Sequence, residues 1–483
     1  MKNLSTIPAD PAERRRFLRL GLAGAGAVSM SAFLTACGGD DDDDDASSGG
    51  EAPGGGDGGA PPAAKSPFEE MTALRPADAN GVMLPDGFSS RIVARSGQPP
   101  VTGAENWHGA PDGGACFAAA DGGWVYVSNA ELALDGAGRP AGGVGALRFA
   151  KDGALIDSYP ILKGTGGNCS GGPTPWGTWM SCEEFEFDPA GPEAALVGRA
   201  AGMVWECDPF TPWVDGQSGR SFPALGLFAH EAVCVDAKNK VLYLTEDAGS
   251  TPNAGGGRLY RFVCDASDWP GSRDRPRLQS GKLQVLRIKA LPADAEVIAA
   301  AAAATLDLNA PCEVEWQDAV RPDEGQAFVR ETEALAGRTP PGTYFPKCEG
   351  VWFHDGIVYF ATQSNNRIWA HDIAGQTVEV IYDGNGNAAD PVGHSVNQPD
   401  NITVTALGEV IAVEDGGNLE VGIVRTDGTS QAIARLEGHD DSETTGVAFS
   451  PDGRRMYFSS QRGATGDSAD GVTFEILLPS PAR

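Results

Sequence analysis

The sequence predicts an all-β fold in which similar units are arranged radially, as in a β-propeller. In one recurring pattern, a carboxylate opens a short apolar strand, a turn follows, and a second strand ends on another acid or amide. The clearest copies are the segments 230–247, 349–366, 400–415 and 443–461. The separations from a first acid to a last acid or amide are 15, 14, 14 and 18 residues, counted from Glu231 to Glu246, Glu349 to Gln363, Asp400 to Glu414 and Glu443 to Gln461. A period of this kind indicates repeated units, and 65 Gly and 34 Pro residues suit tight turns between short strands.

Other segments support the same fold class, with one exception. Alternating apolar and polar residues predict strands at 124–131 and 174–187 and a hairpin that turns at 151–153. The segment 291–337 contains an Ala run and few strand formers, so we expect a short, mostly helical insertion there. We expect the propeller domain to span 67–480, a length that allows about six to nine blades.

The N-terminal residues predict a targeting segment rather than part of the folded domain. Three arginines at 14–16 precede an apolar stretch at 20–34, which resembles a twin-arginine export signal. The residues 34–37 resemble a lipobox, which predicts export and a lipid anchor on Cys37 at the cell envelope. A transmembrane helix is the alternative, but this stretch of about 15 residues is shorter than the ~20 that a membrane span needs.

The composition after this signal segment (1–37) limits the classes of function. Residues 38–66 contain six consecutive Asp and a Gly/Pro-rich run, which predicts a disordered tether. The formal net charge is −30, and removal of residues 1–36 brings it to about −33. No basic patch follows the leader, which argues against a nucleic-acid partner. Such acidity suits either a well-solvated exported protein or one whose charge is partly neutralised by bound cations.

Eight cysteines remain after the lipobox, and they do not define a structural metal site by spacing. They are Cys116, Cys169, Cys182, Cys207, Cys234, Cys264, Cys312 and Cys348. An oxidising envelope permits disulfides among them, but spacing alone does not give their pairing. Since no CxxC pair occurs, a structural zinc site is not expected.

The polar ends of the predicted strands are the candidate functional groups. They are Asn129, Glu131, Cys182, Glu183, Glu184, Glu231, Glu246, Asp247, Glu349, Asp400, Glu414, Asp415 and Glu443. A single Glu at a strand end is usually a solvated charge, whereas several in register on a propeller axis would lie together and need cations. Oxygen-rich clusters favour calcium, magnesium or manganese, and a thiolate among them favours a transition metal such as iron.

One long motif gives a family resemblance. The segment 168–184, NCSGGPTPWGTWMSCEE, resembles the signature of the PhoX-type alkaline phosphatase family in its Trp, Gly, Cys and acidic positions. Asn129 and Glu131 resemble an earlier Asn-x-Glu element. Glu349, the pair at 414–415 and Glu443 resemble later elements, so that the resemblance covers about residues 100–465.

This resemblance implies a six-bladed propeller that hydrolyses small phosphomonoesters at an axial cluster of two Fe3+ and three Ca2+ ions. It implies that iron binds Cys182, that iron or bridging positions involve Glu231, Glu349 and Glu414, and that calcium is held by Glu131, Glu183 and Asp400. Glu443 completes the expected metal ligands. We expect the catalytic groups to be Cys182, Glu231, Glu349, Glu414 and Arg367. Candidate cations for the substrate phosphate are Lys347, Arg367 and Arg462.

Two other functions stay open at this point. A calcium-stabilised propeller could act as a non-catalytic binding protein of the envelope, because this fold hosts many functions. Another calcium-dependent propeller hydrolase, such as a lactonase or diesterase, would suit Asn365 and Asn401 as ligands. In each case we expect a monomer that meets the membrane only through lipid on Cys37.

Overall fold

A computed structural model describes residues 65–185, 201–215, 219–248, 256–272, 274–292, 295–319, 322–323, 342–387 and 396–479. The predicted signal segment and almost all of the predicted tether lie outside these residues. Nearly all of the described residues belong to one compact unit, Glu70–Ser480. In these ranges, no helix is both long and apolar enough to cross a membrane.

Five antiparallel sheets make up this unit. The first sheet contains, in spatial order, β3 (Pro111–Ala118), β4 (Trp124–Ala130), β5 (Gly142–Phe149) and β6 (Leu155–Thr165). The second contains β7 (Asn168–Pro173), β8 (Trp179–Glu183), β9 (Val204–Cys207) and β10 (Arg220–Ser221).

The third sheet has nine strands and consists of two meanders joined edge to edge. One meander contains β11 (His230–Asp236), β12 (Val241–Glu246), β13 (Leu259–Cys264) and β14 (Gly281–Ile288). The other contains β16 (Cys348–His354), β17 (Ile357–Thr362), β18 (Arg367–Asp372) and β19 (Thr377–Asp383). The strand β15 (Cys312–Asp318) pairs with β14 along most of its length and with β19 at its beginning.

The last two sheets combine strands from both ends of the chain. One contains β20 (Pro399–Val404), β21 (Val410–Glu414), β22 (Glu420–Val424), β23 (Ser430–Leu436) and the early strand β1 (Val82–Met83). The other contains β24 (Thr444–Phe449), β25 (Arg455–Ser460), β26 (Val472–Leu477) and the early strand β2 (Ser89–Arg95). Two pairings between chain ends therefore close the arrangement.

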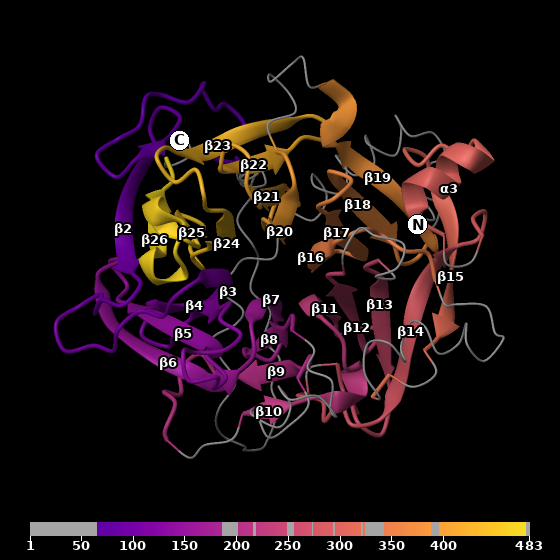
Figure 1. Cartoon of the computed structure of the whole chain (residues 1–483), viewed down its shortest axis with the longest axis horizontal. Coiled ribbons are helices and arrows are strands. Elements are labelled where there is room, and N and C mark those ends of the chain that lie inside the picture. The colour runs from indigo at the N-terminus through magenta and orange to yellow at the C-terminus, as the bar shows by residue number, and fades with distance from the viewer. Residues whose placement is uncertain are drawn as a thin grey trace, which may run out of the picture. The chain divides into compact units, whose positions relative to one another are not determined.

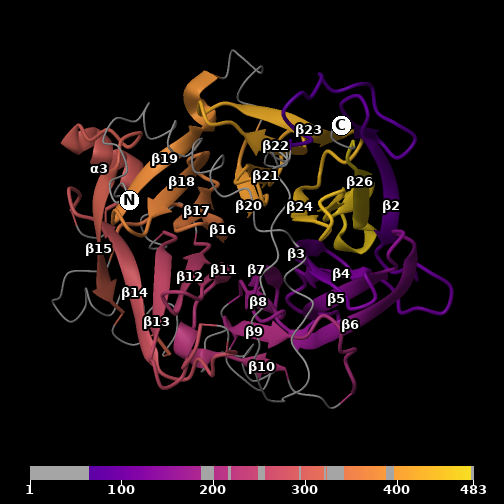
Figure 2. The same ribbon diagram turned by 180° about the vertical axis from the view of Figure 1, so that it is seen from behind.

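The sheets stand around a common centre, and one strand of each meander lies innermost (Figure 1, Figure 2). Neighbouring inner strands contact one another in a closed cycle, in the order β3, β7, β11, β16, β20, β24 and back to β3. Apolar side chains fill the space between successive sheets; for example, Val125 and Val127 of β4 pack with Trp179 of β8 and Trp205 of β9. The predictions of an all-β fold and a propeller-like arrangement are confirmed, while hydrogen bonding groups the strands into five sheets rather than six.

The predicted helical insertion is partly wrong. The Ala run forms the helix α3 (Val297–Ala304), whose N-terminal N–H groups bond to the side chain of Glu296. The segment at 312–318 is instead the strand β15, because it pairs with β14 and buries Cys312 and Val314. Residues 324–341 lie outside the described ranges. The described 3-10 helices are η2 (Pro223–Leu225), η4 (Gly384–Asn387), η5 (Gly463–Thr465) and η6 (Ser468–Asp470).

Candidate active site

Each innermost strand carries a β-bulge close to its beginning. Between two paired positions, the inner strand has one residue more than its neighbour. The bulges lie between Pro111 and Gly114, Asn168 and Gly171, His230 and Val233, Cys348 and Val351, Pro399 and Ile402, and Thr445 and Ala448. A bulge redirects a side chain and increases local twist, and it commonly lies next to functional sites.

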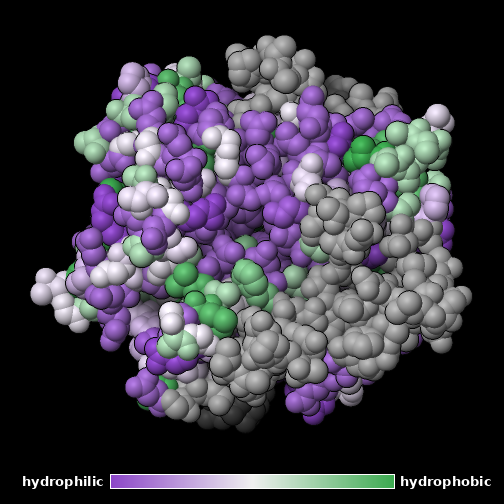
Figure 3. Space-filling model, in the orientation of Figure 1, coloured by the Kyte–Doolittle hydropathy of each residue, from purple (hydrophilic) through white to green (hydrophobic). Residues whose placement is uncertain are grey.

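Five of these bulges bring acidic or thiol side chains toward the centre. The residues at the second position of the strands are Asp112, Cys169, Glu231, Glu349 and Asp400. With Glu131 and Glu184 they form three overlapping groups, in which the potential ligand atoms lie within 4.8 Å of one another. We call these seven residues the acidic centre. Figure 3 shows hydrophilic residues gathered in the middle of one face of the molecule.

A second set of equivalent positions follows the second strand of each meander. In each case the backbone N–H of the residue after this second strand donates to a carbonyl oxygen near the beginning of the inner strand. The carbonyl belongs to a residue two or three positions before the first bulged residue, and the distances are 2.9–3.2 Å. We call them the rim positions: Glu131, Glu184, Asp247, Gln363, Asp415 and Gln461. Four are carboxylates and two are amides, so the repeated backbone presents a mixed ring of oxygen and nitrogen groups.

The acidic centre is largely buried, and Glu231 within it lacks a hydrogen-bond partner. Both carboxylate oxygens of Glu231 are buried without a hydrogen-bond partner. Burial, followed by the charges of Glu349 and Asp400, raises the pKa of Glu231 well above its ordinary value. Burial and neighbouring carboxylates likewise raise the pKa of Asp112 and of Asp400. Carboxylates in such a place either take up protons or bind cations.

Two cationic side chains lie beside these carboxylates. The Lys347 ammonium is 3.6 Å from Asp247, 3.6 Å from Glu349 and 3.9 Å from Asp415. Although burial lowers the pKa of Lys347, the charges of Glu349 and Asp247 outweigh it and raise that pKa above its usual value. The Arg462 guanidinium is 3.2 Å from Glu443 and 3.9 Å from Asp415. Both cations are therefore charged and close to the centre.

The structure brings together some predicted metal ligands and separates others. Glu131, Glu231, Glu349 and Asp400 belong to the acidic centre, and Glu443 lies at its edge beside Arg462. Asp112 and Cys169 were missed. Each stands where the sequence repeat has its first acid, so the segments 112–131 and 168–184 could have been recognised as further copies of the repeat.

The structure places Cys169, and not the predicted Cys182, beside the carboxylates. Cys182 lies in β8 and packs in an apolar cluster with Met180, Val204 and Phe228. Cys169 lies in the bulge of the inner strand β7, within ligand distance of Glu184 and Glu231. Burial and then the neighbouring carboxylates raise the pKa of the Cys169 thiol, so a bound cation would be needed to hold it as a thiolate.

Glu183 and Glu414, two further predicted ligands, do not belong to the acidic centre. Glu183 accepts backbone N–H groups from Gly166 at 2.9 Å and Met203 at 3.1 Å. Glu414 accepts backbone N–H groups from residues 397 and 420 at 2.6 and 2.8 Å. Both carboxylates thus accept backbone N–H groups from nearby segments, and the rim positions belong to the residues that follow them, Glu184 and Asp415.

Arg367 has different partners from the other two candidate cations. Its guanidinium binds Asp383 at 2.7 Å and the carbonyl oxygen of Asn365 at 2.8 Å, which holds the beginning of β18 to the end of β19. Arg367 is thus engaged within its own meander, whereas Lys347 and Arg462 pair with carboxylates at or beside the acidic centre.

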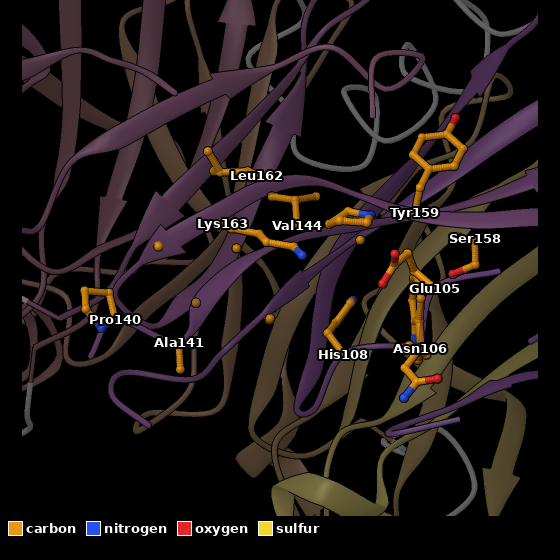
Figure 4. A pocket seen from close by; sticks show the side chains of 17 residues that line it. Glu105, Asn106, His108, Pro140, Ala141, Val144, Ser158, Tyr159, Leu162 and Lys163 are labelled. Carbon is orange, nitrogen blue, oxygen red and sulfur yellow. The ribbon is translucent and has the colours of Figure 1, made fainter. Parts of the chain in front are cut away.

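A separate hollow of about 250 Å³ lies beside β5 and β6 and includes none of the acidic centre (Figure 4). Lys163 points into it from one side and Glu105 lines another (Figure 4). His108 also lines this hollow (Figure 4), and its Nε2 atom is buried without a hydrogen-bond partner close to Gly145. We do not choose this hollow as the functional site, because the acidic and thiol side chains gather at the acidic centre.

All eight cysteines in the described part of the chain are free, and seven are buried. The disulfides that an oxidising envelope would permit are therefore not formed among these residues. Each buried thiol packs as a small apolar side chain, except Cys169, which contacts the carboxylates.

An acidic, thiol-containing centre on the axis of a propeller-like fold defines a candidate metal-dependent enzyme. The family model of alkaline phosphatase PhoX matches residues 126–463. The chain belongs to the alkaline phosphatase PhoX family and is accordingly a phosphatase.

Comparison with solved structures agrees with this family. Pseudomonas fluorescens PhoX, in complex with vanadate as a transition state analogue, has 17% identity and a TM-score of 0.62, over 84% of this chain and 98% of that chain. Less similar is a Xanthomonas campestris gluconolactonase, at 14% identity and a TM-score of 0.34 over 85% and 99% of the two chains. A Staphylococcus aureus virginiamycin B lyase has 12% identity and a TM-score of 0.38 over 81% and 99%. No curated protein matches this chain.

Proposed function

We propose that this phosphatase hydrolyses phosphomonoesters at a cluster of metal ions held by the acidic centre. One observation carries the proposal: Glu231 buries both carboxylate oxygens without a partner, among the acids Glu184, Glu349 and Asp400. A buried carboxylate loses its hydration, so an ionised Glu231 needs a compensating positive charge. A multivalent cation would supply that charge. The residues present therefore fit the group that the family implies.

The donor set supports a mixture of metals. The carboxylates of Glu349 and Asp400 are hard oxygen ligands, which suit Ca2+. The thiol of Cys169, with Glu184 and Glu231, offers a thiolate among carboxylates, which suits a transition metal such as iron. When bound, the ions would polarise the phosphoryl group and activate the attacking oxygen.

The side chains of this protein have two further tasks. Lys347 and Arg462 lie beside the acidic centre and can bind the nonbridging oxygens of a phosphomonoester dianion. They would orient the ester and stabilise the additional charge that develops during transfer. Carboxylates at Asp247 and Asp415 hold both cations in place until substrate arrives.

The metal proposal is tested with matched cysteine variants of the full chain. We expect elemental mass spectrometry of the wild type to find iron and calcium, and a chromogenic phosphomonoester to be hydrolysed with added calcium. Cys169→Ala should lose iron and at least ~100-fold of the rate, because it removes the one thiol of the centre. Cys182→Ala should keep iron and activity and lose only about 1 kcal/mol of stability, because it removes a buried thiol from an apolar cluster.

The opposite results would reject the proposal. Calcium alone without turnover would leave a binding protein or another hydrolase. Equal loss of iron in both variants would mean that the two thiols are not distinguished by their positions. The vanadate complex of the Pseudomonas fluorescens relative makes vanadate a suitable inhibitor for the same assay.

We also propose that the nine-stranded sheet counts as two blades, which gives six in all. Two observations support this count: the closed cycle of inner strands and the recurrence of one bulge in each of them. For export through the twin-arginine route and lipid attachment at Cys37, the support is the sequence of residues 14–37 alone. A Cys37→Ser variant that stays in the membrane fraction would contradict the anchor.

A further inference from the structure

Gln461 stands between the acidic centre and Arg462 and contacts both. Its Nε2 donates to Asp112 Oδ2 at 2.6 Å and also to Glu131. Its Oε1 accepts from Arg462 Nη1 at 2.6 Å. The side chain is buried, and the backbone N–H of Gln461 donates to the carbonyl oxygen of Glu443 at 3.1 Å. Gln461 is thus fixed in the backbone and has both ends of its amide in use.

The contacts on the two sides of Gln461 define the orientation of its amide. Only the NH2 group can donate to the two carboxylates, and only the oxygen can accept from the guanidinium. A carboxylate at this position could still accept from Arg462, but it would face Asp112 and Glu131 as a third negative charge. Four of the six rim positions carry acids, so the amide here is a departure from the repeated pattern that the neighbouring groups explain.

The position of Arg462 depends on this amide. Arg462 Nη1 is shared between Gln461 Oε1 at 2.6 Å and Glu443 Oε1 at 3.2 Å, and the Arg462 backbone N–H donates to Ser442 Oγ at 2.9 Å. A long arginine side chain loses much conformational freedom when it is held in one geometry. Through the short contact to Gln461, the guanidinium is linked to Asp112 of the neighbouring inner strand β3 and to Glu131, which follows β4.

We propose that Gln461 is a positioning residue that couples phosphate binding by Arg462 to cation binding by Asp112 and Glu131. The inference rests on the proposed function, since it assigns substrate phosphate to Arg462 and cations to the acidic pair. Through the amide, occupation of the acidic pair and orientation of the guanidinium favour each other. Gln461 itself touches neither substrate nor the reacting atoms.

The coupling is tested with a double-mutant cycle in the full chain, with phosphate binding measured on the metal-loaded protein and Ca2+ binding measured by titration after treatment with a chelator. Gln461→Met keeps the length of the side chain and removes its hydrogen bonds. We expect it to raise the Kd for inorganic phosphate about 5- to 10-fold and to raise the Ca2+ concentration for half-saturation about 3-fold or more. In an Arg462→Ala background, the same change should alter the phosphate Kd less than about 2-fold while its effect on Ca2+ persists.

Two further variants separate the two faces of the amide. Gln461→Glu keeps the acceptor for Arg462, so its phosphate Kd should stay nearer to wild type than that of Gln461→Met, while its metal-free Tm should be the lowest. Gln431→Met is the matched control, because Gln431 accepts from Arg425 at 2.7 Å in an outer strand. It also breaks a Gln–Arg hydrogen bond, and both affinities should stay at wild-type values.

Specific outcomes would overturn the coupling. One is an unchanged phosphate Kd and Ca2+ midpoint in Gln461→Met while the wild type binds both. Another is an equally large phosphate effect in the presence and absence of Arg462. If the wild type binds Ca2+ and phosphate but hydrolyses no ester, the cycle still reports the coupling, and only the proposed reaction fails.

Discussion

At the scale of single residues, the site depends on which of two adjacent polar residues faces the centre. The sequence offers the pairs Glu183–Glu184 and Glu414–Asp415, and composition does not choose between their members. Side chains in a strand alternate between the two faces, so an error of one residue places the wrong carboxylate at the centre. The bulges add one residue to each inner strand. They interrupt the alternation at the positions where it would be needed to predict which side chains face the centre. The acids could therefore be predicted as a group, but not one by one.

The burial of Glu231 should cost stability in the metal-free protein. Its carboxyl group must either stay charged beside Glu349 and Asp400 or take up a proton that the unfolded chain does not carry at neutral pH. We expect Glu231→Gln to raise metal-free stability by about 1–2 kcal/mol, measured by urea unfolding with chelator, since an amide avoids that cost. The same variant should lose at least ~100-fold of its activity because a metal ligand is gone.

Glu183→Gln is the matched control with the opposite sign. Glu183 accepts two backbone N–H groups, so its replacement should lower metal-free stability by about 1–2 kcal/mol and leave metal content unchanged. Lower stability in both variants would show that Glu231 is compensated in the metal-free protein and is not held ready for a cation.

At the scale of elements, the recurring hairpins were the part of the fold that the sequence revealed best. The four predicted copies correspond to the strand pairs β11–β12, β16–β17, β20–β21 and β24–β25. The strand β15 was missed although its residues alternate between apolar and polar side chains, because the nearby Ala run led to the whole segment 291–337 being interpreted as helical. The alternation fits the observed strand, which pairs with β14 and β19.

The close approach of inner strands gives a test at the same scale. In the bulge of β16, a Cβ on Gly350 would lie 2.7 Å from the Ile402 backbone nitrogen and 2.8 Å from the Asp400 carbonyl oxygen of β20. We expect Gly350→Ala to push these strands apart and to cost about 1–3 kcal/mol in urea unfolding. It should also weaken Ca2+ binding, because Glu349 and Asp400 would no longer converge on one ion.

Gly136→Ala provides the comparison for this substitution. No atom lies within 4 Å of a Cβ built at Gly136, so the same change in an exposed turn should leave both stability and the Ca2+ midpoint near wild type. If Gly350→Ala behaved like Gly136→Ala, the spacing of β16 and β20 would not control the site.

At the scale of the whole molecule, the acidic centre exists only when the inner strands are assembled. Its seven residues come from five meanders, and no single sheet contains more than the two from one meander or, in the nine-stranded sheet, Glu231 and Glu349. Closure depends in turn on β1 and β2, which pair with β23 and β26 from the other end of the chain. Periodicity along the sequence predicts that the acids meet, but it does not give their depth or the distance between them.

Cations bound at the acidic centre should stabilise the entire unit, and the number of coupled ions can be obtained from the dependence of Tm on cation concentration. A ligand that binds only the folded state adds about 1.4 kcal/mol per ion for each tenfold rise in its free concentration above Kd. For a unit spanning Glu70–Ser480, the entropy of unfolding is about 0.9 kcal/mol/K, so each coupled ion should raise Tm by about 1.6 °C per decade. We expect calorimetry of the full chain, first treated with a chelator and then titrated with Ca2+, to give a slope above about 3 °C per decade, which corresponds to at least two coupled ions. Glu349→Gln should reduce the slope, because Glu349 of β16 lies in one group of potential ligands with acids of β11 and β20. Glu206→Gln is the control: this carboxylate pairs with Arg220 in the outer part of another sheet, so its replacement should lower Tm without changing the slope. A Tm that does not respond to Ca2+ or chelator would mean that the carboxylates are compensated by protons alone and that the inner strands are not joined by metal.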